Sequence, residues 1–128
     1  MIINDCPFCL IEDYDVISSN EFIISILDKY PISPGHMLAI PRRHVISVFE
    51  TTKEEQNALL EEIEQAKIWI ERKYTPDGYN IGINDGTAAG QTIMHLHVHI
   101  IPRYRGDLSD PRGGVRWVLP EKANYWSD

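Results

Sequence analysis

Three of the five histidines in this 128-residue chain lie within five positions, at His95, His97 and His99. Successive side chains of an extended strand point to opposite faces, so the three imidazoles are expected to share one face. The apolar side chains between them are then expected to enter a core on the other face. These alternating apolar residues are Leu96, Val98 and Ile100.

Two kinds of chemistry fit such a row of imidazoles. Three imidazoles on one face could hold a catalytic zinc ion. Alternatively, one imidazole could be a nucleophile while its neighbours position groups and move protons. The strand by itself leaves both interpretations open.

A second chemical motif, Cys6-Pro7-Phe8-Cys9, lies near the N-terminus. The C-x-x-C spacing is typical of a zinc site or of a redox pair. The residues after Cys9 do not predict the strand and helix that flank a thioredoxin-like redox motif. Two cysteines are half of a four-ligand structural zinc site, so two histidines from elsewhere would have to complete it. Two unrelated buried thiols are the remaining interpretation.

The elements that must position these residues follow from hydrophobic periodicity and turn residues. One long helix is expected from the capping box of Thr52 and Glu55 to about Lys73, with its acidic run facing solvent. Its apolar residues at helical spacing are Leu59, Ile63, Ala66 and Ile70. Strands are expected over residues 14–18, 22–27, 36–40, 79–83, 95–101 and 115–119, with Pro41 ending the third.

A loop of small residues, Thr87–Thr92, leads directly into the histidine segment. Glycine and small side chains allow backbone N–H groups to approach an anion, as in phosphate-binding loops. The position of this loop ahead of three histidines indicates a phosphate site.

Composition and charge exclude several classes of partner. The formal charge is −7, from 12 basic and 19 acidic residues, whereas nucleic-acid binding favours a basic surface. No apolar run approaches the roughly eighteen residues of a membrane span, and the N-terminus lacks the features of a signal peptide. We therefore expect a cytoplasmic protein, with one domain over residues 1–128 and neither nucleic acid nor membrane as partner.

Together these motifs resemble the histidine triad (HIT) family. The hallmark is histidine alternating with hydrophobic residues, and His95–Ile101 fits it completely. Supporting stretches are 34–41, 84–86 and 90–92, in the family's order. The resemblance implies an α+β fold with a five-stranded antiparallel sheet, one long helix and a homodimer. It also implies nucleotidyl hydrolase or transferase activity on a small-molecule nucleotide.

The resemblance assigns a role to each histidine of the predicted site. His97 would attack the α-phosphorus of a nucleotide and form a nucleotidyl-histidine that water hydrolyses. His99 and His36 would contact phosphate oxygens or the leaving group. The substrate-binding residues implied in the same way are Asp28, Asn84, Gly90, Gln91, Thr92 and Arg103.

Some members of the family carry a structural zinc, and the matching ligands here are Cys6, Cys9, His44 and His95. His95 would then be a ligand and not a catalyst. A site with four protein ligands has no open position for water, which is typical of structural zinc. No catalytic metal is strictly required by this mechanism, and the zinc would anchor a short N-terminal segment.

The continuation Pro102-Arg103 resembles the dinucleoside polyphosphate hydrolase branch of the family. Arginine suits bidentate phosphate contacts, so the arginines after the histidine segment are expected to meet additional phosphates. Two alternatives stay open at this point. One is a nucleoside phosphoramidate hydrolase, and the other is a nucleotide-binding regulatory protein with incidental turnover.

Overall fold

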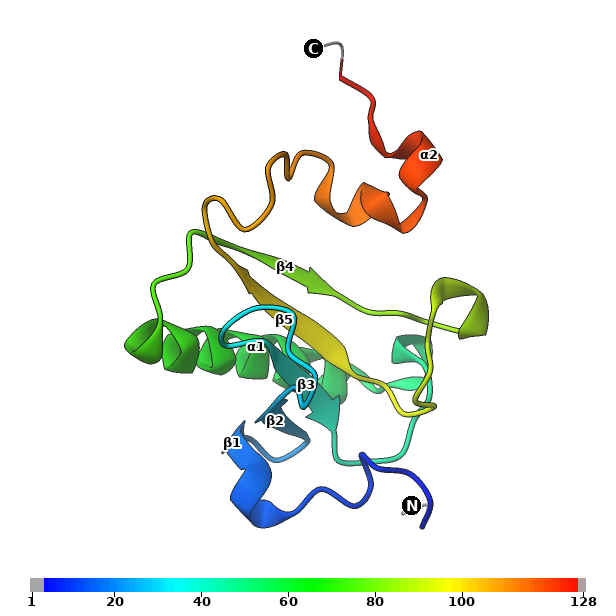
Figure 1. The fold of residues 1–128 in the computed structure, drawn as a ribbon. Coiled ribbons are helices and arrows are strands. Elements are labelled where there is room, and N and C mark those ends of the chain that lie inside the picture. Colours follow the sequence, from blue (N-terminus) through cyan, green and yellow to red (C-terminus); the bar gives the residue numbers. More distant parts are fainter. Residues whose placement is uncertain (1–3, 127–128) are drawn as a thin grey trace.

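The computed structural model describes residues 4–126 and shows a five-stranded antiparallel sheet with a long helix on one face (Figure 1). The strands are β1 (Val16–Ser19), β2 (Ile23–Leu27), β3 (Met37–Pro41), β4 (Gly78–Gly82) and β5 (Val98–Arg103). Their order in the sheet is β1-β2-β3-β5-β4, and all neighbours are antiparallel. The strand that carries His99, β5, therefore lies between β3 and β4. The predicted α+β fold class is confirmed.

The long helix α1 (Lys53–Lys73) begins where the sequence predicts. The side chain of Thr52 accepts from the Glu55 N–H, and the Glu55 carboxylate accepts from the Thr52 N–H. Its apolar stripe packs on the sheet, and each fully buried Ile or Leu side chain stabilises the fold by roughly 1.5–3 kcal/mol. The core on this face comprises Ile23, Met37, Ala39, Ala58, Leu59, Ala66, Ile70, Val98 and Ile100.

The other face of the sheet is covered by the N-terminal segment. Phe8, Ile11 and Val16 pack there against a second apolar cluster of Ile24, Ile26, Leu38 and Ile40. Because both faces are covered, every residue of β3 is buried. This arrangement places the two cysteines of the N-terminal segment beside His44 and His95, which lie just outside β3 and β5.

The prediction that the acidic residues of α1 all face solvent is wrong at two positions. Glu62 is 1% exposed and accepts a hydrogen bond from Ser25 Oγ at 2.5 Å. Glu55 is 4% exposed and forms an ion pair with Arg43 at 2.7 Å. Each carboxylate has a polar partner that a helical periodicity does not reveal, which makes its burial possible.

Several predicted boundaries differ from the structure. β5 begins at Val98, so His95 and His97 precede the strand, and residues 93–95 form a bend. β3 includes Pro41 as its last residue. Residues 13–15 form the 3₁₀ helix η1 (Asp13–Asp15) ahead of β1, and the strand predicted over 115–119 is instead the 3₁₀ helix η4 (Gly114–Val118). Further 3₁₀ helices are η2 (Val48–Glu50) and η3 (Thr87–Ala89).

The C-terminal part of the chain lies beside β4 and ends in the short helix α2 (Pro120–Ala123) (Figure 1). The guanidinium of Arg116 holds η4 and α2 together by donating to the carbonyl oxygens of Lys122 and Ala123 at 2.6 and 2.9 Å. These bonds satisfy two carbonyl oxygens at the end of α2. None of the helices in residues 4–126 is long and apolar enough to cross a membrane.

Candidate functional site

Four possible zinc ligands, which we name the Cys/His cluster, meet where the N-terminal segment touches the sheet: Cys6, Cys9, His44 and His95. The Sγ atoms of Cys6 and Cys9 lie 3.4 and 3.6 Å from His95 Nδ1. Cys9 Sγ lies 3.2 Å from His44 Nδ1. Zn–N and Zn–S bonds of about 2.0–2.3 Å in a tetrahedral site put neighbouring ligand atoms roughly 3.3–3.8 Å apart. The three Cys–His distances are close to this range, and all four predicted ligand atoms lie within 4.8 Å of one another.

The tautomer of His95 also suits a metal ligand. Its Nε2 lies 2.8 Å from the carbonyl oxygen of Pro41, so Nε2 carries the proton and Nδ1 presents its lone pair to the thiols. Burial lowers the pKa of His95, which favours the neutral ring. Burial raises the pKa of the Cys6 thiol, and a bound cation would counteract this by favouring the thiolate.

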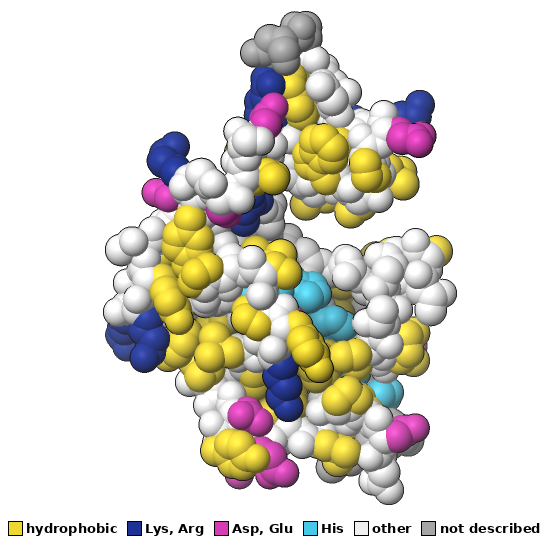
Figure 2. Space-filling model, in the orientation of Figure 1, with side chains coloured by type: hydrophobic (Ala, Val, Ile, Leu, Met, Phe, Trp, Pro, Cys, Tyr) yellow, Lys and Arg dark blue, Asp and Glu magenta, His cyan; other side chains and the backbone are white. Residues whose placement is uncertain are grey.

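A cavity of about 1410 Å³ is lined by the other histidines of the site, His36, His97 and His99. Its walls come from the N-terminal segment, the β2–β3 loop, β4, the loop before β5 and η4. Figure 2 shows histidine side chains in this hollow, beneath the C-terminal part of the chain. The volume exceeds the roughly 300–1000 Å³ of ordinary small-molecule pockets, so it has room for a nucleotide and a leaving group together.

His97 is held in one tautomer by its own segment. Its Nδ1 donates to the carbonyl oxygen of His95 at 2.8 Å, which leaves the Nε2 lone pair available. The ring of Phe8 contacts it edge-on, with ring centroids 5.0 Å apart. No role for Phe8 was predicted from the sequence. Its position between Cys6 and Cys9, two predicted metal ligands, could have indicated that this ring lies near the site.

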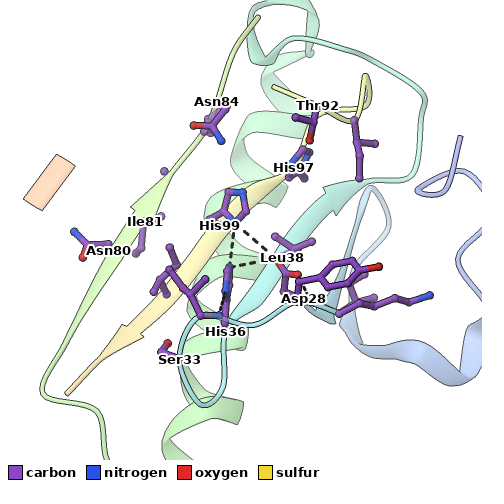
Figure 3. Close-up of a pocket in the computed structure, with 18 of the residues that line it drawn as sticks. Asp28, Ser33, His36, Leu38, Asn80, Ile81, Asn84, Thr92, His97 and His99 are labelled. Atoms are coloured by element: carbon purple, nitrogen blue, oxygen red, sulfur yellow. Dashed lines mark hydrogen bonds and ion pairs between the residues drawn. The ribbon is translucent and has the colours of Figure 1, made fainter. Parts of the chain in front are cut away.

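Asp28, His36 and His99 form a second group, which we name the Asp/His cluster (Figure 3). His36 Nε2 lies 3.0 Å from His99 Nδ1 and 3.4 Å from Asp28 Oδ2. Burial lowers the pKa of His36, against a smaller opposing effect of Asp28. Burial also lowers the pKa of His99, and the neighbouring His97 and His36 lower it further. Both rings are therefore expected to be neutral near pH 7.

The backbone decides which nitrogen of His36 carries the proton. The N–H of Ile32 donates to His36 Nδ1 at 3.2 Å, so the neutral ring carries its proton on Nε2. That proton is directed at His99 Nδ1, which in turn places the proton of neutral His99 on Nε2. A metal ion at His36 Nε2 would force a proton onto Nδ1, facing the N–H of Ile32. The Asp/His cluster is thus arranged for hydrogen bonding and proton chemistry.

The loop 84–92 supplies some of the predicted substrate contacts. Asn84, Gly90 and Thr92 line the cavity, and Thr92 lies beside His97 (Figure 3). Gln91 does not line the cavity. Its amide nitrogen donates to the carbonyl oxygens of residues 46 and 93 at 3.0 and 3.1 Å. Both amide hydrogens are therefore used within the protein, and the substrate contact of Gln91 stays a prediction that would require these bonds to break.

Arg103 lines the cavity but is already paired. Its Nε and Nη2 each donate to the carboxylate of Asp107 at 2.8 Å, and Nη1 donates to Asn80 at 2.7 Å. Arg105 and Arg112 likewise have aspartate partners, Asp77 and Asp110, and no pattern in the sequence predicts these pairs. The guanidinium groups expected to meet extra phosphates thus have acidic neighbours.

A family model for the HIT domain matches residues 12–106. The asymmetrical bis(5'-nucleosyl)-tetraphosphatase of Schizosaccharomyces pombe is 44% identical over 80 residues, which are 62% of this chain and 44% of that protein. The bis(5'-adenosyl)-triphosphatase of Dictyostelium discoideum is 35% identical over 101 residues, which cover 79% of this chain and 68% of that protein.

Among solved structures, a zinc-bound histidine triad family protein from Mycobacterium smegmatis superposes with a TM-score of 0.72 at 35% identity. The match covers 80% of this chain and 78% of that one. The family model, the identities and the shared fold agree with the arrangement of the histidines. This chain belongs to the HIT domain family.

Proposed function

We propose that this protein is a nucleotidyl hydrolase that acts on dinucleoside polyphosphates or similar nucleotide conjugates through a nucleotidyl-histidine intermediate. The observation that carries the proposal is the bond from His97 Nδ1 to the carbonyl of His95, because it leaves Nε2 as a nucleophile at the cavity. The similarity to proteins named as dinucleoside polyphosphate hydrolases supports the reaction class. A neutral imidazole is nucleophilic without prior deprotonation.

In the first step His97 Nε2 attacks the α-phosphorus, a P–N bond forms, and the P–O bond to the leaving polyphosphate breaks. The leaving group departs as an anion, and the positive charge on the substituted imidazole is stabilised through Nδ1–H by the His95 carbonyl. The Nε2–H of His99 can donate to phosphate oxygens as their charge increases. In the second step water attacks phosphorus, the P–N bond breaks, and a proton is released with the nucleoside monophosphate.

Substrate contacts are assigned from the cavity lining. Asp28 would accept hydrogen bonds from the ribose hydroxyls, with Asn84 as a second polar contact. Gly90 and Thr92 would face the phosphate, since both lie at the cavity within the loop that precedes the histidines. His36 would act through His99, whose Nδ1 accepts a hydrogen bond from the Nε2–H of His36.

The test is rapid acid-free quenching of the enzyme with a substrate labelled at the α-phosphate. Wild-type protein should carry label in an acid-labile bond within the first turnover, and His97→Ala should carry none. A labelled adduct that persists in His97→Ala would assign the nucleophile to another group.

A phosphoramidate hydrolase is the second candidate, and the pairing of Arg103 with Asp107 favours it, because a phosphoramidate needs no extra phosphate contact. Comparing kcat/KM for diadenosine polyphosphates and for an adenosine phosphoramidate separates the two. If neither is turned over while a nucleotide still binds, a regulatory nucleotide-binding role is the better description.

We also propose one structural zinc per chain in the Cys/His cluster and a homodimer. The spacing of the ligand atoms and the tautomer of His95 support the zinc. For the dimer, β4 has a neighbouring strand on one side only within residues 4–126. Elemental analysis and light scattering test these two statements separately.

A further inference from the structure

Five consecutive residues, 44–48, which we name the strap, join the Cys/His cluster to the rest of the site. His44 at its start is a cluster member, 3.2 Å from Cys9. The carbonyl of the next residue, Val45, accepts from the N–H of Leu96 at 2.7 Å. Leu96 stands between His95 and His97 in sequence, so the strap is bonded to the segment that carries the proposed nucleophile.

The far end of the strap is bonded to the loop 84–92. Ile46 accepts through its carbonyl oxygen from Gln91 Nε2 at 3.0 Å. The carboxylate of Asp85 accepts from the Ser47 hydroxyl and from the N–H of Val48, both at 3.2 Å. Two residues of the loop thus form hydrogen bonds with three successive residues of the strap.

Gln91 also closes the loop on itself. Its Oε1 accepts from the N–H of Gly86 at 2.8 Å, and its Nε2 donates to the Ile93 carbonyl at 3.1 Å. The residue is 4% exposed. Moving this side chain would leave buried donors and acceptors unpaired, which costs about 1–3 kcal/mol for each group. The positions of Gly90 and Thr92 at the cavity therefore depend on the strap.

We propose that Gln91 and Asp85 are positioning residues through which metal occupancy of the Cys/His cluster sets the phosphate-binding position of the loop 84–92. This inference rests on the proposed function, for both the zinc and the nucleotide. A metal ion that holds His44 in place holds the start of the strap, and the strap holds the loop. Since coupling between two ligand sites is reciprocal, a bound nucleotide phosphate must then strengthen zinc binding by the same factor.

The experiment measures zinc affinity by competition with a chromophoric chelator, with and without saturating ligand. The ligand is the tightest-binding of AMP, GMP, CMP and UMP, and the matching nucleoside serves as the ligand without a phosphate. In wild-type protein the monophosphate should tighten zinc binding roughly 5- to 50-fold, the range of ordinary coupling. The nucleoside should have little effect. In Gln91→Ala the monophosphate should tighten zinc binding clearly less than in wild-type protein, because the bond from the loop to Ile46 is removed and only the Asp85 bonds to the strap remain.

Gln56→Ala is the matched control. Gln56 also donates from its amide to a neighbouring carbonyl, that of Thr51 at 3.4 Å, but it lies at the start of α1 and not at the cavity. This variant should keep the wild-type coupling. Undiminished coupling in Gln91→Ala, equal coupling by the nucleoside, or none in wild-type protein would overturn the inference. If none of the monophosphates binds, the proposed function itself fails, which is a different result.

Asp85 gives a second test that does not depend on Gln91. Asp85→Asn keeps an oxygen that can accept from the Val48 N–H, whereas Asp85→Ala keeps no acceptor. The asparagine variant should therefore retain most of the coupling between zinc and phosphate, and the alanine variant should retain clearly less. Wild-type coupling in Asp85→Ala would remove Asp85 from the link.

Discussion

The Cys/His cluster and the Asp/His cluster use overlapping residue types at nearly equal spacing, yet the backbone prepares them for different chemistry. The three Cys Sγ–His Nδ1 contacts of the first cluster measure 3.2–3.6 Å, and the three contacts of the second measure 3.0–3.9 Å. In the first, a carbonyl oxygen, that of Pro41, accepts the proton of His95. In the second, a backbone N–H, that of Ile32, donates to His36.

The difference shows that the hydrogen bond between one imidazole nitrogen and the backbone determines the chemistry of the other nitrogen, which faces the cluster. A carbonyl behind the ring leaves a lone pair in front, which suits a cation. An N–H behind the ring leaves a proton in front, which suits a neighbouring acceptor such as His99. Residue types and distances alone do not separate the two cases. The variants below test whether the clusters are as independent as these bonds indicate.

The largest effect is expected from His97→Ala, which removes the proposed nucleophile. Turnover should fall roughly 10⁴–10⁶-fold, as for nucleophile removal in other covalent enzymes. Zinc content and nucleotide affinity should stay near wild type, because His97 belongs to neither group of ligand atoms. Steady-state kinetics with zinc analysis of the same sample measures both. Loss of zinc from this variant would show that the two functions are not separate.

His99→Ala should have the next largest effect on turnover. Removing a hydrogen-bond donor to the reacting phosphate typically costs about 10²–10³-fold in kcat. The effect should appear in kcat, since the bond strengthens as charge develops, and zinc content should again be unchanged. A variant that binds nucleotide weakly but keeps its kcat would instead make His99 a binding residue.

Cys9→Ser tests the other side of the comparison. We expect zinc content to fall from one per chain towards zero and stability to fall by about 3 kcal/mol, or roughly 10 °C in Tm. His36→Gln is the matched control in the Asp/His cluster and should leave the zinc content at one. Zinc loss from His36→Gln would contradict the assignment of proton chemistry to that cluster.

Stability should also depend on pH through the Asp/His cluster. The pKa of His36 and of His99 is lowered in the folded protein, chiefly by burial, so below the unfolded value of about 6.5 the unfolded chain binds more protons. The contribution of the two neutral histidines to the free energy of unfolding is therefore complete above pH 6.5. It is lost as the pH falls from 6.5 towards the lowered pKa values of the folded state. Urea unfolding between pH 7.5 and 5.5 measures this slope. The slope should be smaller in His36→Gln, and an unchanged slope would assign the acid sensitivity to the zinc ligands.

Much of this arrangement could be predicted from the sequence because it depends on local patterns. Alternation around His97, the capping box at Thr52 and the C-x-x-C spacing indicate a strand, a helix start and half a metal site. What escaped prediction depends on long-range partners. Glu62 looks like a solvent-facing residue until Ser25 is placed opposite it, and no local pattern predicts the bonds from Gln91 Nε2 to the carbonyl oxygens of Ile46 and Ile93.

The smallest effect is expected from Arg103→Ala, where a partner has already neutralised the charge. The hydrogen bonds that Arg103 donates to Asp107 lower the pKa of the Asp107 carboxyl to about 2. An exposed pair of this kind contributes little, so KM for a dinucleoside polyphosphate should rise only about two- to fivefold, and KM for a phosphoramidate less. Asp107→Asn gives the opposite test, because it frees the guanidinium. If Arg103 binds an additional phosphate, the KM of Asp107→Asn for the polyphosphate should be lower than that of wild type, and its KM for the phosphoramidate should be unchanged. Equal effects on both substrates would show that Arg103 braces the cavity wall through Asn80 and does not distinguish the two leaving groups.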